Sequence, residues 1–503
     1  MSLILPPEVS LKDETITFLN NGPKNLLINN EWVAAADGAT FATHNPATGQ
    51  ELVQVASAGT ADVDAAVNAA RAALTTGPWA KMSGQDRADF MMRVADLIDK
   101  YAAELGELET LDNGMPIRSA QYGNMPLAAR HFRYYAGWAT KLEGSTIPVH
   151  YPNQFVYTRR EPMGVVGLII PWNFPFLMCA WKLAPALACG NTAILKPAEE
   201  TPLTALRLGE ILIEAGMPAG VVNILPGPGV PTGSAITAHM GIDKVAFTGS
   251  TEVGRKIMTA AANSNLKRVS LELGGKSPNV IFADADVNSA TKGSMWASFS
   301  NTGQECIAGS RLFVERPVLD QVVEGLAAGV QNIRIGNGFA PKMHLGPIIT
   351  PQQTDRIMGY IESGRDNGAE LVAGGQRLDG DLAEGNFIAP TIFTHENDEL
   401  DLVKEEIFGP VVAVTPFDDW EELVARANQT NYGLAAGVWT RDIAKAHQFA
   451  HAVQAGAVYV NQYGLFDPAV PFGGYKESGF GREMGKEALD LYTQTKTVWV
   501  SLR

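Results

Sequence analysis

The chain has 503 residues, more than a single hydrophobic core usually organises, so we expect at least two domains. Hydrophobic residues make up 46% of the chain and charged residues 18%, a composition that excludes wholesale disorder. The net charge of −15, without a basic block, disfavours a nucleic-acid partner, because binding to phosphates needs clustered basic side chains.

Three cysteines, Cys179, Cys189 and Cys306, show no CxxC spacing, which disfavours a disulfide framework. The N-terminal stretch lacks the basic residues and the apolar length of a signal peptide. Residues 163–181 carry no charge, but two prolines in the middle of this segment predict a strand, a turn and a helix instead of a membrane span. We therefore expect a cytoplasmic protein with no membrane partner.

Helical periodicity dominates the first part of the chain. We predict helices over 62–74, behind a Thr60 cap, over 83–111 and over 119–139, followed by an exposed strand over 154–161. From residue 162, apolar strands alternate with helices. The strands of this region are predicted at 164–170, 192–196, 221–225, 244–247 and 269–273. This alternation indicates a Rossmann-like parallel sheet with helices on both faces, which binds ligands at the carboxyl ends of its strands.

A second α/β region is predicted over about 275–480. Its strands are expected at 278–282, 311–315, 411–417, 434–440 and 457–460. Its helices are expected near 286–301, 318–330, 419–428 and 442–454. The C-terminal segment, residues 493–501, alternates in polarity again and predicts another strand.

Two familiar ligand motifs are absent. His447 and His451 are spaced for a zinc site, but Gln448 stands where a zinc protease needs glutamate, so we predict no metal. Gly249 and Gly254 are spaced GxxxxG, which is not the usual dinucleotide fingerprint.

Three residues are candidates for chemistry. Cys306 follows a turn-like run and precedes a strand, Glu272 ends a predicted central strand, and Asn173 lies in an uncharged turn. Each also fits a structural role: a buried apolar thiol, an acid paired with Lys276, and an Asx turn.

Seven motifs decide between these interpretations. They are PWNFP (171–175), KPAEETP (196–202), FTGSTEVG (247–254), LELGGKSP (271–278), GQECIAGSR (303–311), EEIFGPV (405–411) and PFGGYKESGFGRE (471–483). In this order and spacing, the chain resembles the NAD(P)-dependent aldehyde dehydrogenase superfamily from about residue 27 onward.

The resemblance implies oxidation of an aldehyde to a carboxylic acid. Cys306 would add to the carbonyl carbon, because a thiolate attacks readily and leaves a thioester that water can cleave. The Asn173 amide and the Cys306 backbone N–H would stabilise the resulting oxyanion. Glu272 would be the general base that activates water against the thioester.

The resemblance also implies NAD as cofactor. Glu199 beside Lys196 would accept hydrogen bonds from free ribose hydroxyls and repel a 2′-phosphate, so NADP is less favoured. The residues implied to contact the cofactor are Trp172, Lys196, Glu199, Gly249, Ser250, Leu273, Glu406 and Phe408.

The implied substrate pocket is mostly apolar or aromatic, which favours an apolar or aromatic aldehyde. Its residues are Phe174, Leu177, Met178, Trp181, Glu305, Ile307, Phe466 and Phe472. Two positions depart from the pattern of many relatives. Glu305 is charged and could hold a quaternary ammonium group, whereas Gln462 stands where cation-binding relatives often carry cysteine. The alternatives are thus a betaine-type aldehyde dehydrogenase, a cysteine esterase without a redox role, and a non-catalytic structural protein.

The family's architecture implies three parts: a discontinuous NAD-binding domain (1–144 and 162–273), a catalytic domain (274–482) and a small β oligomerisation arm (145–161 and 483–503). Exposed alternating strands such as those of the arm need a partner. We therefore expect a homo-oligomer, either a dimer or a dimer of dimers (a homotetramer).

Overall fold

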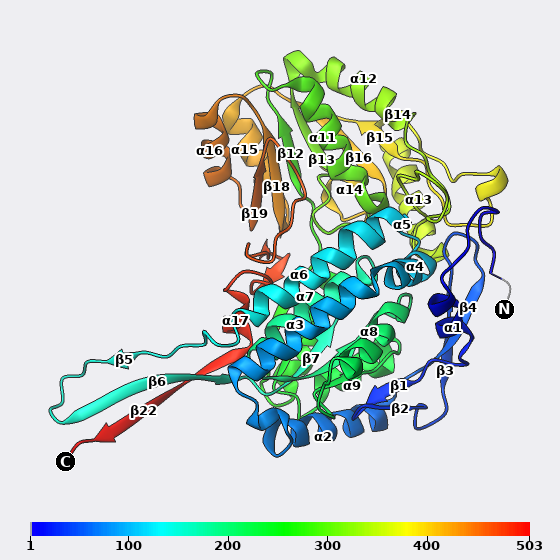
Figure 1. The fold of residues 1–503 in the computed structure, drawn as a ribbon. Coiled ribbons are helices and arrows are strands. Elements are labelled where there is room, and N and C mark those ends of the chain that lie inside the picture. Colours follow the sequence, from blue (N-terminus) through cyan, green and yellow to red (C-terminus); the bar gives the residue numbers. More distant parts are fainter. Residues whose placement is uncertain (1–2) are drawn as a thin grey trace.

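The computed structural model describes residues 3–503. It has two lobes, each built on one large sheet, and a thin arm that projects away from both (Figure 1). An N-terminal helix and a hairpin lie at the edge of the first lobe: α1 (Asp13–Asn20), β3 (Thr40–His44) and β4 (Glu51–Ala56).

The first lobe contains an eight-stranded sheet in the order β2-β1-β9-β8-β7-β10-β11-β21. The five central strands are parallel. They are β9 (Val222–Ile224), β8 (Thr192–Lys196), β7 (Val165–Ile169), β10 (Lys244–Thr248) and β11 (Arg268–Glu272). The antiparallel edges are β2 (Glu31–Val33), β1 (Leu26–Ile28) and β21 (Gly479–Phe480). The central strands are apolar and mostly buried, as expected for a parallel sheet covered on both faces.

Helices cover both faces of this sheet. One apolar core contains residues of α3 (Gly84–Lys100), α4 (Ala102–Asn113), α6 (Met125–Ala136), α7 (Pro175–Ala188) and α8 (Leu203–Glu214). A second core contains residues of α2 (Thr60–Thr75), α9 (Ser234–Ala238) and α10 (Thr251–Asn263). Because β7, β8, β10 and β11 are parallel, their carboxyl ends lie along one rim of the sheet, where the functional loops begin.

The second lobe contains a seven-stranded sheet in the order β14-β15-β16-β13-β12-β18-β19. All its pairs are parallel except β14 with β15. The strands are β14 (Glu370–Ala373), β15 (Thr391–Thr394), β16 (Val411–Phe417), β13 (Arg311–Glu315), β12 (Pro278–Ile281), β18 (Ala435–Trp439) and β19 (Ala457–Val460). The covering helices are α11 (Val287–Phe299), α12 (Leu319–Val330), α13 (Pro351–Asp366), α15 (Trp420–Asn428) and α16 (Ile443–Ala452).

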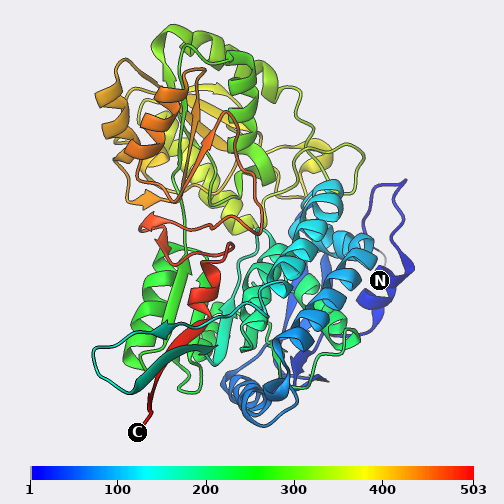
Figure 2. The same cartoon turned by 60° about the vertical axis from the view of Figure 1, so that its left-hand side comes forward.

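The arm is a three-stranded antiparallel sheet, β22-β6-β5. Its strands are β5 (Thr146–Ile147), β6 (Gln154–Pro162) and β22 (Thr493–Ser501). Figure 2 shows the arm from a second side, with the C-terminus at its tip. Between the arm and the body lies the short helix α17 (Ala488–Leu491), and β17 (Tyr432–Gly433) pairs with β20 (Tyr475–Lys476) near the junction of the lobes.

Some local predictions were wrong. The helix predicted over 83–111 is two helices, because Tyr101 leaves helical geometry (φ −99°, ψ 13°) between α3 and α4. Thr60 is not the N-cap of the helix predicted over 62–74, because it is the first residue of α2. The N-cap is Gly59, whose backbone N–H donates to the Asp62 carboxylate at 2.8 Å. The helix predicted over 119–139 begins with a π-helical turn at Ala120–Asn124. Within residues 3–503, no helix has the length and apolar character needed to cross a membrane.

Candidate active site

Cys306 lies in a loop with an unusual backbone. Between α11 and β13, Asn301, Thr302 and Gly303 have positive φ angles of 47°, 58° and 70°. A Cβ on Gly303 would lie 2.1 Å from the Gly409 carbonyl oxygen, so only glycine fits there. Gln304 fixes the next step of the chain, because its Oε1 accepts the Ile349 N–H at 3.0 Å. This left-handed run presents the half-buried Cys306 to the space between the lobes.

Asn173 is held next to that loop by hydrogen bonds on both of its sides. It lies in the turn from β7 to α7, and its Nδ2 donates to the Gln304 carbonyl at 2.9 Å. Its own carbonyl accepts from Asn301 Nδ2 at 3.0 Å. A side-chain amide has two N–H groups, so one fixes the orientation of Asn173 and the second stays available. Within residues 3–503, no other residue accepts from the Cys306 backbone N–H, which lies beside its own thiol.

Glu272 is a buried acid at the carboxyl end of β11. It is 5% exposed, and among residues 3–503 its Oε2 has no hydrogen-bond partner. Burial raises the pKa of Glu272 well above its ordinary value; nearby Glu483 raises it further, while Lys182 and Arg482 act in the opposite direction. The proton is therefore held more tightly than by a solvated carboxyl, and the ionised form is a stronger base.

Two glycines pass between Cys306 and Glu406. A Cβ on Gly275 would lie 2.2 Å from the Cys306 carbonyl oxygen, and a Cβ on Gly274 would lie 2.3 Å from a Glu406 carboxylate oxygen. The Gly275 N–H donates to Glu406 Oε1 at 2.9 Å. Burial raises the pKa of Glu406 to about 7. Cys306 and Glu406 thus both pack against the loop that follows β11, at neighbouring glycines.

The surroundings of Cys306 hold its sulfur as a thiol. Burial raises the pKa of Cys306 well above its ordinary value, and the acids Glu406, Glu305 and Glu272 raise it further. None of these three neighbours carries a positive charge that would stabilise a thiolate. Ionisation of the thiol therefore needs a proton acceptor or an added positive charge.

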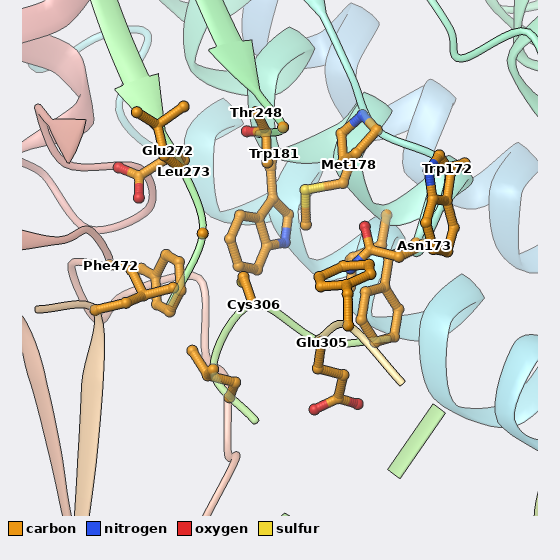
Figure 3. Close-up of a pocket in the computed structure, with 18 of the residues that line it drawn as sticks. Trp172, Asn173, Met178, Trp181, Thr248, Glu272, Leu273, Glu305, Cys306 and Phe472 are labelled. Atoms are coloured by element: carbon orange, nitrogen blue, oxygen red, sulfur yellow. The ribbon is translucent and has the colours of Figure 1, made fainter. Parts of the chain in front are cut away.

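A single cavity of about 340 Å³ connects these groups. In Figure 3, Glu272 and Asn173 lie on opposite sides of Cys306, with Trp181 and Met178 between them. Every residue predicted for the site lines this cavity except Lys196 and Glu199. Those two lie at the end of β8, the strand beside β7, where Lys196 Nζ lies 3.4 Å from Glu199 Oε2. Within residues 3–503, no cluster of three or more His, Cys, Asp or Glu is arranged to hold a metal ion.

One wall of the cavity is aromatic. The ring centroids of Trp181, Phe466 and Phe472 lie 5.3–5.6 Å from one another. Glu305 breaks this apolar lining. Its Oε1 accepts from Ser300 Oγ at 2.9 Å, and no other residue within 3–503 donates to the carboxylate. Burial raises the pKa of Glu305 to about 7.

The other end of the cavity is held by helix α13. Gln353 Nε2 donates to the carbonyls of Ile407 and Phe408 at 3.3 and 3.2 Å, and an Arg356 guanidinium donates to the Glu406 carbonyl at 3.1 Å. These bonds hold Phe408 at a φ of 57°. The Phe408 ring meets Trp172 edge to face at 5.2 Å.

The sequence reasoning missed several functional candidates. Lys182 and Glu483 form a buried ion pair, 0% and 5% exposed, beside Glu272. Glu483 ends the last family motif, which was a usable signal, but its pairing with Lys182 needs the fold. Gln353 and Arg356 also line the cavity, and they were missed together with α13, whose polar sequence hides its helical period.

Comparisons with known proteins agree on one family. The model of the aldehyde dehydrogenase family matches residues 32–498. The chain is 50% identical to the mitochondrial aldehyde dehydrogenase of Homo sapiens over 479 residues, which cover 95% of this chain and 92% of that one.

Two solved structures are also similar. An aldehyde dehydrogenase of Bacillus cereus in complex with NAD+ has a TM-score of 0.96 and 48% identity, and the match covers 98% of this chain and 100% of that one. A betaine aldehyde dehydrogenase of Staphylococcus aureus, also with NAD+, has a TM-score of 0.95 and 36% identity, with 98% and 97% covered.

Proposed function

This chain belongs to the aldehyde dehydrogenase family and oxidises aldehydes with NAD as cofactor, and we propose that it does so through a covalent adduct on Cys306. Once the Cys306 thiol has lost its proton to water in the cavity, the thiolate adds to the aldehyde carbon and forms a thiohemiacetal oxyanion. A free aldehyde does not release hydride readily, whereas the tetrahedral oxyanion does. Oxidation of this adduct leaves a thioester on Cys306, which water cleaves to the acid.

Asn173 and the Cys306 backbone stabilise the oxyanion in this proposal. The Asn173 amide is already oriented by its bond to the Gln304 carbonyl, so its second N–H costs little reorganisation when charge develops. The Cys306 N–H is the second donor. A neutral amide suits this role because it stabilises the oxyanion without forming an ion pair that would trap it.

Glu272 is the proposed general base. Its raised pKa lets it take a proton from the water that attacks the thioester, and its unpaired oxygen is available to accept that proton. The Lys182–Glu483 pair behind it adjusts the affinity of Glu272 for the proton, because its two members act on that pKa in opposite directions.

The residues at the strand ends suit NAD. Ser250 caps α10, whose N-terminus faces the rim and favours a phosphate. A Cβ on Gly249 would lie 2.4 Å from the Phe247 ring, so the chain passes closely there. We propose that Glu199 and Lys196 hold the adenine ribose, that Glu406 holds the nicotinamide ribose, and that Trp172, Leu273 and Phe408 pack against the cofactor. Bound NAD supplies the acceptor for the hydride. Glu199 favours NAD over NADP.

The aromatic wall suits an apolar or aromatic aldehyde. It is lined by Phe174, Leu177, Met178, Trp181, Ile307, Phe466 and Phe472. One observation favours a second candidate, a quaternary ammonium aldehyde: Glu305 brings a carboxylate with one free oxygen to this wall. A panel of aliphatic, aryl and ammonium aldehydes, each with NAD and NADP, separates the two by kcat/KM.

The arm suits contact between subunits. It exposes apolar side chains, including Phe155, Trp499 and Leu502, which a second copy would cover. We propose a homo-oligomer, a dimer or a dimer of dimers, in the cytoplasm, where the three free cysteines stay reduced. The proposed domain division follows the two sheets, with β21 crossing from the catalytic segment to the first sheet.

The observation that carries the proposal is the convergence of Cys306, Asn173 and Glu272 on one cavity. The test is the formation of reduced nicotinamide from aldehyde and NAD. Cys306→Ser and Cys306→Ala are expected to stop this reaction while the protein still binds NAD. Aldehyde-dependent reduction of NAD by Cys306→Ala at the wild-type rate would contradict the proposal.

A further inference from the structure

Trp181 presents a buried hydrogen-bond donor to the substrate cavity. The residue is 3% exposed, and its Nε1–H has no acceptor within residues 3–503. Most buried polar groups are paired, so an unpaired donor in a binding cavity needs an explanation. Trp181 lines the cavity, and Figure 3 shows the nitrogen edge of the indole facing the group formed by Met178 and Asn173.

The direction of this donor is fixed by its neighbours. His131 stacks on the indole at 5.8 Å, and Phe466 and Phe472 meet its other sides at 5.6 and 5.3 Å. His131 brings no charge: burial lowers the pKa of His131 to about 4, and its Nδ1 contacts the Leu127 carbonyl at 2.8 Å. The indole therefore cannot turn to find another acceptor, and its N–H is oriented before a ligand binds.

We propose that Trp181 Nε1–H is a specificity determinant that binds a neutral oxygen on the part of the aldehyde beyond its carbonyl group. This inference rests on the proposed function and names the substrate class more narrowly: aldehydes that carry an ether, hydroxyl or ketone oxygen. A site that holds an unpaired buried donor discriminates against the analogue that leaves it unpaired.

The lining of the cavity favours an uncharged oxygen at this position. Glu272, Glu305, Glu406 and Glu483 line the cavity against a single base, Arg356. A carboxylate on the aldehyde would lose its hydration in this poorly solvated space and would find Arg356 as its one basic neighbour in the cavity lining, so its burial is costly. We therefore expect kcat/KM to be highest for an aldehyde with an ether oxygen, lower for its apolar isostere and lowest for an aldehyde with a carboxylate.

The experiment compares methoxybenzaldehydes with ethylbenzaldehydes at ring positions 2, 3 and 4. Each pair has nearly the same size, because an oxygen replaces one methylene group, and the inherent difference in carbonyl reactivity within a pair is measured with the variants below. At the position that faces the indole, the methoxy-to-ethyl ratio of kcat/KM is expected to be about 3- to 10-fold higher in the wild type than in a variant without the indole N–H, which is the scale of one neutral hydrogen bond. The 4-carboxybenzaldehyde is expected to be poorer than either.

Two changes at position 181 separate hydrogen bonding from packing. Trp181→Phe, or a benzothienyl side chain that replaces the N–H by sulfur, is expected to lower the methoxy-to-ethyl ratio by about 3- to 10-fold relative to the wild type. Trp420→Phe is the matched control, since that half-buried indole stacks on Phe282 in the second lobe, and it is expected to leave the ratio unchanged.

The possible results are distinct. A methoxy-to-ethyl ratio that is the same in the wild type and in Trp181→Phe at every ring position overturns the inference, even where the variant oxidises both aldehydes more slowly. If no aldehyde yields reduced nicotinamide, the proposed function fails and the inference falls with it.

Discussion

Replacing Asn173 with alanine removes an oxyanion donor and one structural hydrogen bond at the same time. Loss of one such donor lowers the rate of acylation by about 10²–10³, or about 2.7–4 kcal/mol in activation free energy. The Gln304 carbonyl also loses its 2.9 Å partner. Because Gln304 is 2% exposed, an unpaired carbonyl there lowers the free energy of unfolding by about 1–3 kcal/mol.

The assay for Asn173→Ala is single-turnover formation of reduced nicotinamide, which reports acylation without product release. Alkylation of Cys306 by iodoacetamide, followed by mass spectrometry, shows whether the thiol is still presented. The matched control is Asn301→Gly, which removes the bond to the Asn173 carbonyl but keeps the amide and tolerates the positive φ. Asn301→Gly is expected to lose less activity than Asn173→Ala. Equal acylation rates for Asn173→Ala and the wild type would refute the oxyanion assignment.

Three further changes test the rest of the site. Glu272→Gln removes the general base, so steady-state turnover is expected to fall by about 10²–10⁴ while the first-turnover burst remains; loss of the burst as well would contradict a role confined to hydrolysis. Because the pKa of Glu272 is raised, wild-type hydrolysis should increase with pH above the usual carboxyl range, and Glu272→Gln should lack this increase in a stopped-flow pH series. Lys182→Met leaves the Glu483 carboxylate buried without its partner, so thermal denaturation should show a loss of about 3–5 kcal/mol, which the double variant with Glu483→Gln largely restores. Since Lys182 lowers the pKa of Glu272, the acidic limb of the Lys182→Met pH profile should also move to higher pH, and an unmoved limb would refute this coupling.

The sequence predicted the strands better than the helices. The strands over 192–196, 311–315, 411–417 and 457–460 have the predicted bounds. Compact apolar runs between turn residues define a strand locally. The break at Tyr101 left no such signal, because the apolar periodicity runs on through it. Helix α13 and strands β14 and β15 were not predicted, since the polar sequence of α13 carries few apolar residues at helical spacing.

For the site, motifs were sufficient to name the candidate residues but not their interactions. Cys306, Glu272 and Asn173 each belong to a motif, and all three line one cavity. The pairing of Lys182 with Glu483 joins residues 301 positions apart, which no local pattern can predict. The unpaired indole of Trp181 was equally hidden, because the sequence does not say which polar atoms lack partners.

The backbone of Gly274 and Gly275 is the only part of the loop after β11 that separates the Cys306 carbonyl from the Glu406 carboxylate. The Cys306 carbonyl packs closely against Gly275, and the Glu406 carboxylate packs against Gly274 and accepts the Gly275 N–H. Both neighbours contact this pair of residues at close range, so we expect a displacement of one to move the other. The loop of the proposed nucleophile and the acid proposed to bind the cofactor therefore pack against the same two glycines. We expect a substitution that shifts either one to shift the other as well.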